Sequence, residues 1–323
     1  VWAINAFGWS VASDASDAVS PTVPTGTRAL FGPSNAGQSI DTVLIPTTGN
    51  ATDWGDLGTV TTPMGLANTT RLLYKFGEVS GSRSATIEYT SWAGSGGSFL
   101  DFGDISSSGP AAGIGTVAND TRGLLASGVA LDTGLDTSAI EYVTIASTGN
   151  TTSFGSVTVE RRNLTGFGST TRGVFAGGRS GSGTYYNIID YVTIASTGNA
   201  IDFGDMNNSV RQVSSFSSST RGCIGGGFTG STGINNIDYV TIASTGNATD
   251  FGDLLTVLFG QAAASSTTRG LFAGGQGVGF AQTNTIQYVT IASTGNATDF
   301  GDLTQNRSGF DEAGVSNAHG GLS

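Results

Sequence analysis

The chain has 323 residues, carries a formal net charge of −11 at pH 7 and contains a single lysine, Lys75. A nucleic-acid surface needs clustered cations that displace counterions from phosphate, and this sequence has no such cluster. The composition therefore excludes a nucleic-acid partner and disfavours an anionic membrane surface. The longest apolar runs are far too short for a membrane span, so we expect no membrane insertion.

Short β-branched and aromatic runs bounded by Gly, Asn and Ser occur along the chain, which is typical of strands and turns. Few segments carry a 3.6-residue apolar period. The 51 glycines recur at fixed places beside Phe, Tyr, Ile and Val, which favours a packed all-β fold over disorder.

Three sequence markers recur together and define a repeat. The first is a Tyr-Val-Thr-Ile-Ala-Ser-Thr-Gly-Asn segment at Tyr142–Asn150, Tyr191–Asn199, Tyr239–Asn247 and Tyr288–Asn296, with degenerate copies at Thr42–Asn50 and from Tyr89 onward. The second is a Thr-Arg step at Arg28, Arg71, Arg122, Arg172, Arg221 and Arg269. The third is an aromatic-Gly-Asp step that ends at Asp56, Asp104, Asp205, Asp253 and Asp302.

Each repeat predicts four short strands, here named a to d. In the last full copy these are residues 258–266, 269–275, 286–293 and 298–303, and Thr294-Gly295-Asn296 forms the turn between strands c and d. Gly and Asn accept the positive φ that such hairpin turns require. Four strands per repeat of this length indicate a β-propeller blade. A parallel β-helix is the rival fold, but its rungs are usually shorter and lack the c–d hairpin.

In chain order, we expect full blades at about residues 12–57, 58–105, 106–156, 157–206, 207–254 and 255–303. Residues 1–11 and 304–323 are expected to form a seventh, split blade, to which the C-terminus gives strands a and b and the N-terminus gives strand d. Residues 1–323 are then one propeller domain of seven four-stranded blades closed by both termini. Six blades with frayed ends is the alternative.

The glycine pair after strand b, the Tyr of strand c and the aromatic residue of strand d resemble a kelch blade. The phrases at Thr268–Gly275 and Tyr288–Leu303 are more specific. They are similar to repeat proteins of marine bacteriophages, chiefly cyanophages, where such chains are virion structural or tail-fibre-like components. The resemblance spans about residues 27–303. It implies an extracellular virion location and a structural or adhesive role, with other virion proteins or a host-surface glycan as partner.

The repeated arginines and aspartates are expected to be structural, because a catalytic site in a propeller is a single asymmetric place. We expect each Arg to pair with an Asp of a strand d or with a neighbouring carbonyl, since its planar fork suits such contacts. An anion site at the central channel is the alternative. The Asp side chains are expected to accept hydrogen bonds from local backbone N–H groups.

The sequence offers little for catalysis, so we expect no enzymatic activity, no cofactor and no metal. Cys223 is expected to be a small buried hydrophobic residue, and His319 to replace the repeated Arg in strand b of the split blade. One His and one Cys do not make a typical zinc site. A propeller hydrolase remains a minor alternative.

Binding residues are expected on the b–c loops, which vary most between repeats and should emerge on one face of the ring. The best candidate patch is Arg179, Tyr185 and Tyr186, because Arg and aromatic side chains suit sugar or protein recognition. Trp92, in the long c–d turn, could anchor a partner on another surface. A cellular lectin-like or kelch-like interaction propeller is the alternative function, and homo-oligomerisation stays open.

Overall fold

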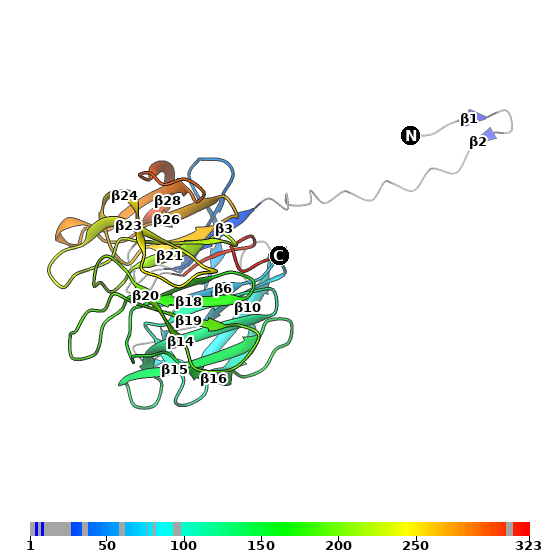
Figure 1. Ribbon diagram of the computed structural model, residues 1–323. Coiled ribbons are helices and arrows are strands. Elements are labelled where there is room, and N and C mark those ends of the chain that lie inside the picture. Colours follow the sequence, from blue (N-terminus) through cyan, green and yellow to red (C-terminus); the bar gives the residue numbers. More distant parts are fainter. Residues whose placement is uncertain are drawn as a thin grey trace.

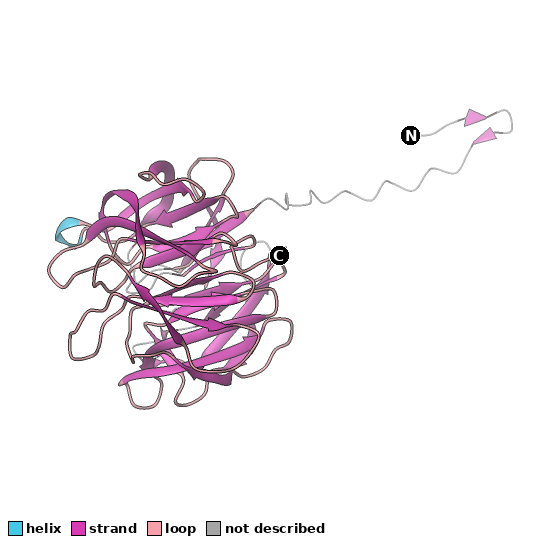
Figure 2. Ribbon diagram, viewed as in Figure 1, coloured by secondary structure: helices cyan, strands magenta, loops and turns pink. Residues whose placement is uncertain are grey.

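The computed structural model shows an all-β propeller whose sheets are arranged around a central axis (Figure 1). The structure describes residues 4–5, 8–9, 27–33, 38–57, 62–75, 77–79, 82–92, 98–307 and 313–323. Among these residues, the one short helix is η1 (Val278–Phe280), which lies in the b–c loop of the last blade (Figure 2).

Six sheets form the ring, and each is numbered here as a blade with its strands given in the order a to d. Blade 1 consists of β29 (Gly314–Ser316), β3 (Arg28–Phe31), β4 (Ser39–Leu44) and β5 (Thr52–Asp56). Blade 2 consists of β6 (Met64–Ala67), β7 (Arg71–Lys75), β10 (Thr86–Ser91) and β11 (Leu100–Asp104). Blade 3 consists of β13 (Gly115–Ala118), β14 (Arg122–Ala130), β15 (Asp136–Thr144) and β16 (Thr152–Ser156), with the short β12 (Pro110–Ala112) also paired to β14.

The remaining three blades follow the same order. Blade 4 consists of β17 (Thr165–Gly168), β18 (Arg172–Ala176), β19 (Ile188–Thr193) and β20 (Ile201–Asp205). Blade 5 consists of β21 (Ser214–Ser217), β22 (Arg221–Gly225), β23 (Ile234–Thr241) and β24 (Thr249–Leu258). Blade 6 consists of β25 (Ala262–Ser265), β26 (Arg269–Ala273), β27 (Thr283–Thr290) and β28 (Thr298–Arg307). Outside the ring sheets, β1 (Ile4–Asn5) pairs with β2 (Gly8–Trp9), and β8 (Glu78–Val79) pairs with β9 (Ser82–Arg83).

A single strand from the C-terminal segment closes the ring. Within blade 1, β29 pairs antiparallel with β3, with Gly314 opposite Phe31 and Ser316 opposite Ala29. The inner strands contact one another in the cyclic order β6, β13, β17, β21, β25, β29 and again β6. The expectation of seven blades is therefore wrong, and the six-bladed alternative is confirmed.

The error in blade number comes from the expected split blade. The C-terminal segment supplies strand a, but to the blade that contains β3, β4 and β5. Residues 318–323, expected as strand b, form turns instead. From residues 1–11 the structure describes only β1 and β2, which pair with each other, and residues 12–26 of the expected first blade lie outside the described residues. Within the described part of residues 304–323, the one new strand is β29, and it completes a blade that already has three strands.

The hydrophobic core consists of six layers, each between two adjacent blades. Strand b contributes to two of these layers because successive side chains point to opposite faces. In β26, for example, Leu271 packs toward blade 1 and Phe272 toward blade 5, and neither is exposed. This two-sided burial explains why strands b are apolar at nearly every position.

The repeated Thr-Gly-Asn turn between strands c and d holds neighbouring blades together. The backbone N–H of Gly246 in blade 5 donates to the carbonyl of Phe203 in blade 4 at 2.7 Å, and that of Ala248 donates to the carbonyl of Asp205 at 2.8 Å. The Asn247 side chain accepts the backbone N–H of Asp205 at 3.1 Å. The repeated turn and the aromatic-Gly-Asp step thus meet across the blade boundary, and their similarity between repeats follows from this shared contact.

The glycine of the aromatic-Gly-Asp step leaves room for that turn. A Cβ atom at Gly155 would lie 2.1 Å from the carbonyl oxygen of Gly198 in the next blade, whereas a Cβ at Gly198 would meet nothing within 4 Å. Neither residue has a φ in the left-handed region. The two glycines therefore lie on opposite sides of one contact and differ in the space around them, not in backbone strain.

We expect Gly155→Ala to destabilise the protein by about 1–3 kcal/mol, because the added methyl group forces two blades apart. That loss corresponds to a fall in Tm of several degrees, measured by circular dichroism during heating. The matched control is Gly198→Ala, for which we expect a Tm close to that of the unmodified chain. Equal effects of the two substitutions would contradict this account of the contact.

Candidate functional site

Five of the six repeated arginines make the same two contacts. Each guanidinium lies over the Tyr ring of strand c in its own blade, at 4.3–4.7 Å for Arg71, Arg122, Arg172, Arg221 and Arg269. Each Nη1 also donates to the carbonyl of an Ile in the next blade, at 2.8–3.0 Å. In blade 1, Arg28 is opposite Leu44 in the ladder, and Thr42 stands in place of the Tyr.

The arginines therefore bind carbonyl groups and tyrosine rings. Among the described residues, none of the three ion pairs includes a repeated arginine. The carbonyl contact expected from the sequence is present, and the Asp partner is replaced by cation–π stacking, which contributes most where the cation is partly desolvated. In these five arginines, a tyrosine ring of the same blade and a carbonyl of the next blade both engage the guanidinium, which supports a structural role at the blade boundary.

The repeated aspartates contribute through their backbone. The side chains of Asp56, Asp104 and Asp205 are exposed, and those of Asp253 and Asp302 are half-buried. In four of these residues the backbone N–H donates to the Asn of the next blade, at 3.0–3.1 Å from Asp104, Asp205, Asp253 and Asp302. Among the described residues, none of these five carboxylates accepts a hydrogen bond, so the local hydrogen bonds expected of them are not seen.

A second set of acidic residues, which was not predicted from the sequence, lies at the boundaries between blades. It occupies the position before the repeated Tyr of strand c, namely Asp41, Glu88, Glu141, Asp190 and Asp238, with Gln287 in blade 6. Asp238 accepts hydrogen bonds from the backbone N–H of Asn207 at 3.0 Å and from its side-chain amide at 2.6 Å. Gln287 likewise accepts the N–H of Leu255 at 2.8 Å. The recurrence of an acid or amide directly before Tyr is the signal that could have revealed this set.

Within the described parts of the chain, buried arginines join this set at two blade boundaries. Arg161 Nη1 lies 2.8 Å from Asp190, and Arg307 Nη2 lies 2.7 Å from Asp41, with all four side chains almost inaccessible. At two other boundaries the apolar residues Val210 and Leu258 hold the corresponding place. A buried pair of this kind is costly to break, because removal of one partner leaves an uncompensated charge.

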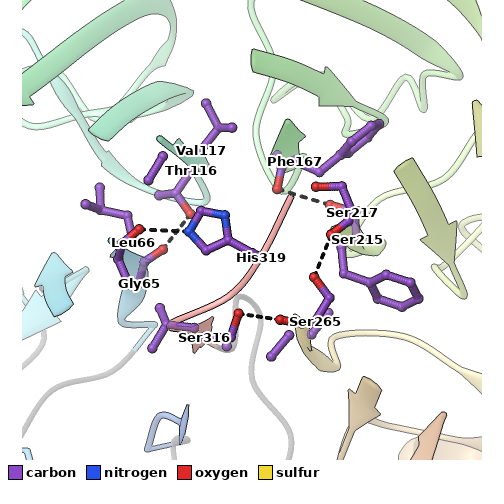
Figure 3. A pocket seen from close by; sticks show the side chains of 18 of the residues that line it. Gly65, Leu66, Thr116, Val117, Phe167, Ser215, Ser217, Ser265, Ser316 and His319 are labelled. Carbon is purple, nitrogen blue, oxygen red and sulfur yellow. Dashed lines mark hydrogen bonds between the residues drawn. The ribbon is translucent and has the colours of Figure 1, made fainter. Parts of the chain in front are cut away.

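The inner strands surround an axial channel lined by small residues (Figure 3). Two hollows lie along this axis, and one residue from each strand a lines both of them, namely Gly65, Thr116, Gly166, Ser215, Ala263 and Gly314. Hydroxyl groups there are engaged with carbonyls of the preceding blade: Ser217 donates to Gly168 at 2.7 Å and Ser265 donates to Ser217 at 2.8 Å. These serine hydroxyls thus satisfy backbone carbonyls along the free inner edges of the sheets.

The C-terminal residues cross one end of this channel. Figure 3 shows His319 pointing into it, where Nε2 contacts the carbonyl of Ala67 at 2.8 Å and Nδ1 accepts the N–H of Gly321 at 3.2 Å. Gly320 N–H donates to Ser217 on the opposite side of the ring at 3.0 Å. His319 thus does not replace a strand-b arginine, as expected from the sequence, but helps to seat this segment. Burial lowers its pKa, which favours the neutral ring that these two contacts require.

The other side chains capable of chemistry are also buried within the fold. Burial raises the pKa of Cys223 to about 12, so its thiol is not activated. Burial lowers the pKa of Lys75 to about 7, and its Nζ donates to the carbonyls of Ser84 and Ala111 at 2.7 and 3.0 Å. Within the described part of the chain, no three His, Cys, Asp or Glu side chains are grouped so that they could hold a metal ion.

The predicted binding residues fall on two different faces. Arg179, Tyr185 and Tyr186 lie together in the b–c loop of blade 4, where the backbones of Arg179 and Tyr185 form an antiparallel bridge. Trp92 lies at the opposite end of the blades, half-buried, with Nε1 donating to the carbonyl of Asn68 at 2.7 Å. It also packs against the core layer between blades 1 and 2. The structure therefore brings three of the four residues together and gives Trp92 a packing contact instead.

Further residues adjoin the Arg179 loop that the repeats did not reveal. The backbone of Arg162, in the connection from blade 3 to blade 4, bridges that of Arg179, with both N–O distances 2.9 Å. Arg211, in the following connection, lies over the ring of Phe228 at 5.1 Å. We call Arg162, Arg179, Arg211, Tyr185 and Tyr186 the loop-face cluster. The connections between blades vary in sequence, so only the fold could place these arginines beside the loop.

Comparisons with known proteins supply no family for this chain. No protein-family model matches it, and no curated protein shows significant similarity to it. No helix in the described part of the structure is long and apolar enough to cross a membrane.

We expect Arg269→Ala to lower the free energy of unfolding by about 1–3 kcal/mol, since it removes a cation–π contact and hydrogen bonds to the next blade. Asp205→Asn, which alters only an exposed carboxylate, should leave Tm unchanged in the same thermal scan. An unchanged Tm for Arg269→Ala would show that the repeated arginines do not join the blades.

We expect Asp190→Asn to destabilise the protein by roughly 3–5 kcal/mol, because it leaves the Arg161 charge buried and unpaired. The matched substitution is Asp238→Asn. Asp238 holds the same position in its blade as Asp190, but no ion pair to an arginine is present there among the described residues. Gln287 shows that an amide is tolerated at this position. Burial raises the pKa of Asp238 above its ordinary value of 3.8, so the ionised carboxylate costs stability at neutral pH.

The Asp238→Asn variant should therefore be at least as stable as the unmodified chain at pH 7. Its advantage should shrink as pH falls through the raised pKa and vanish below 3.8, where the native carboxyl is protonated in both folded and unfolded chains. The free energy of unfolding of both variants is measured by urea denaturation at several pH values. A loss for Asp238→Asn as large as for Asp190→Asn would contradict the assigned role of Arg161.

Proposed function

We propose that this chain is a non-enzymatic structural and adhesive module of a bacteriophage tail or fibre, which presents its b–c loops to a host-surface glycan or another virion protein. The observation that carries the proposal is that repeated and non-repeated residues lie in different parts of the structure. Repeated residues meet at blade boundaries, whereas unlike residues gather in the b–c loops and in the connections between blades, at one end of the ring.

The topology supports this division. In an antiparallel four-stranded blade, the b–c loop and the connection to the next blade emerge at the same end, opposite the a–b and c–d turns. The loop-face cluster lies at the first end, and exposed apolar side chains occur there as well, including Phe280 at 60% and Val278 at 78% exposure. Loops held by a rigid scaffold are the usual place of binding residues.

The virion location rests on the similarity of the repeat phrases to marine phage proteins. The proposal needs neither a cofactor nor a metal. A cellular interaction propeller of lectin-like or kelch-like type would use the same loop face, so the chemistry of the face does not distinguish the two. Mass spectrometry of purified phage particles does, since a virion component is detected in the particle and a cellular protein is not.

The loop face can be tested by blocking it. Cys223 is fully buried, so a thiol introduced on the surface reacts alone with a maleimide-linked polyethylene glycol. We expect this polymer on the Ser182→Cys variant to abolish binding of the full chain to intact marine cyanobacterial cells and to a broad glycan array. Ser182 is exposed in the Arg179 loop.

The matched control is the Thr294→Cys variant, modified in the same way. Thr294 is exposed in a c–d turn at the opposite end of the ring, and its modification should leave binding intact. The assignment of the loop face would be overturned if the modified Thr294→Cys variant lost binding, or if the modified Ser182→Cys variant still bound.

A further inference from the structure

Three of the chain's 13 cationic residues gather in the loop-face cluster. Arg162 and Arg179 are bridged through their backbones, as described above. The backbone N–H of Gly178 donates to the carbonyl of Val210 at 2.8 Å, and the N–H of Val210 contacts the carbonyl of Tyr186 at 3.2 Å. These bonds place Arg211, the next residue, beside the Arg179 loop.

The protein neutralises only part of this charge. Asp136 forms an ion pair with Arg162 and also accepts the backbone N–H of Gly181. Among the described residues, no ion pair reaches Arg179 or Arg211, and the Nε atom of each is buried without a hydrogen-bond partner. With three guanidinium groups and one paired carboxylate, the cluster retains a charge of about +2 at neutral pH.

That excess contrasts with the rest of the molecule. The chain has 24 acidic residues against 13 basic ones, and Arg161, adjacent in sequence, is fully compensated by Asp190. Burial and the positive charges of Arg211 and Arg162 lower the pKa of Arg179, whereas Tyr185 and Asp136 raise it. Like charges held close together lower the stability of the fold. An anion bound between these arginines would offset their repulsion and accept charge-assisted hydrogen bonds from the guanidinium groups.

Aromatic rings and hydroxyl groups border the arginines. The backbone of Tyr185 bridges that of Arg179, and its ring lies against the loop of blade 5, where a Cβ at Gly230 would be 3.0 Å from it. The hydroxyls of Ser180 and Ser182 lie 2.8 Å apart in the same loop. Guanidinium forks bind carboxylate or sulfate in bidentate fashion, while ring faces and hydroxyls suit the body of a sugar.

The cluster is also small. It comprises one short loop and two connecting residues, which suits one or two sugar units better than the roughly 800 Å² per partner of a standard protein interface. We propose that Arg162, Arg179 and Arg211 form a binding site for the carboxylate or sulfate group of an acidic glycan. This inference rests on the proposed role of the loop face in binding.

The test measures binding of the full chain to four probes by isothermal titration calorimetry. The probes are an oligogalacturonate, a sulfated dextran oligosaccharide, a neutral dextran oligosaccharide of similar length and a poly-glutamate peptide. We expect binding to an anionic oligosaccharide that weakens as salt is added, and no binding to neutral dextran. The two anionic oligosaccharides distinguish a carboxylate from a sulfate ligand.

The variants Arg179→Gln and Arg211→Gln should each weaken binding on the order of tenfold or more, the effect of one lost charge-assisted contact. The matched control is Arg83→Gln, which removes one exposed charge from the b–c loop of blade 2 on the same face and should change the Kd less than about twofold. Asp136→Asn should tighten binding by removing the one paired carboxylate. Thermal unfolding confirms that each variant is folded.

The inference is overturned if neither anionic oligosaccharide binds, if poly-glutamate binds more tightly than both, or if Arg83→Gln weakens binding as much as Arg179→Gln does. The polymer-blocking experiment on Ser182→Cys does not depend on the charge of the ligand. Binding that is blocked there but insensitive to the three arginines would leave the proposed function standing and remove only the anionic site.

Discussion

The contact between a c–d turn and the fourth strand of the preceding blade is the constraint on which the rest of the structure depends. Backbone groups from two sheets approach closely enough to hydrogen-bond, and a glycine is needed where they meet. The Asn of the turn, the Gly of the aromatic-Gly-Asp step and the small residue after the turn are all fixed by this one approach. The near-identity of the repeats is therefore a property of the boundaries between blades.

The same contact closes the ring. Gly49 in blade 1 donates to the carbonyl of Phe300 in blade 6 at 2.8 Å, as its counterparts do elsewhere. Further bonds strengthen this boundary: Arg307 pairs with Asp41 and also donates to the carbonyls of Gly32 and Ser39, both at 2.8 Å. The strand β29, from the far end of the chain, adds a backbone ladder inside blade 1. The ring is thus closed by the turn contact and the buried ion pair between blades 6 and 1, together with this ladder within blade 1.

The sequence was sufficient to predict the propeller, its four-stranded blades and the turn between strands c and d, because these follow from local periodicity and glycine chemistry. The number of blades could not be settled from the repeats. Residues 314–316 look like a strand a in either arrangement, and whether they complete an existing blade or begin a new one depends on a pairing with residues 28–31, almost the whole chain away. Counting repeats does not determine such long-range pairing.

The candidate site was predictable only in part, for a related reason. Arg179, Tyr185 and Tyr186 stand out because their loop departs from the repeat. Arg162 and Arg211 stand in connections between blades, and their proximity to that loop is created by the circular arrangement of the sheets. Trp92 lies toward the other surface, as predicted, but the sequence did not reveal that its indole contacts Asn68 and the neighbouring core.

The segment that carries His319 has a consequence for access to the molecule's axis. It touches blade 2 through Ala67 and blade 5 through Ser217, which lie across the ring from each other, so it bars the passage on that side. The chain itself therefore covers that end of the axis. A partner that docks on the loop face, where Arg179 lies, meets the opposite end.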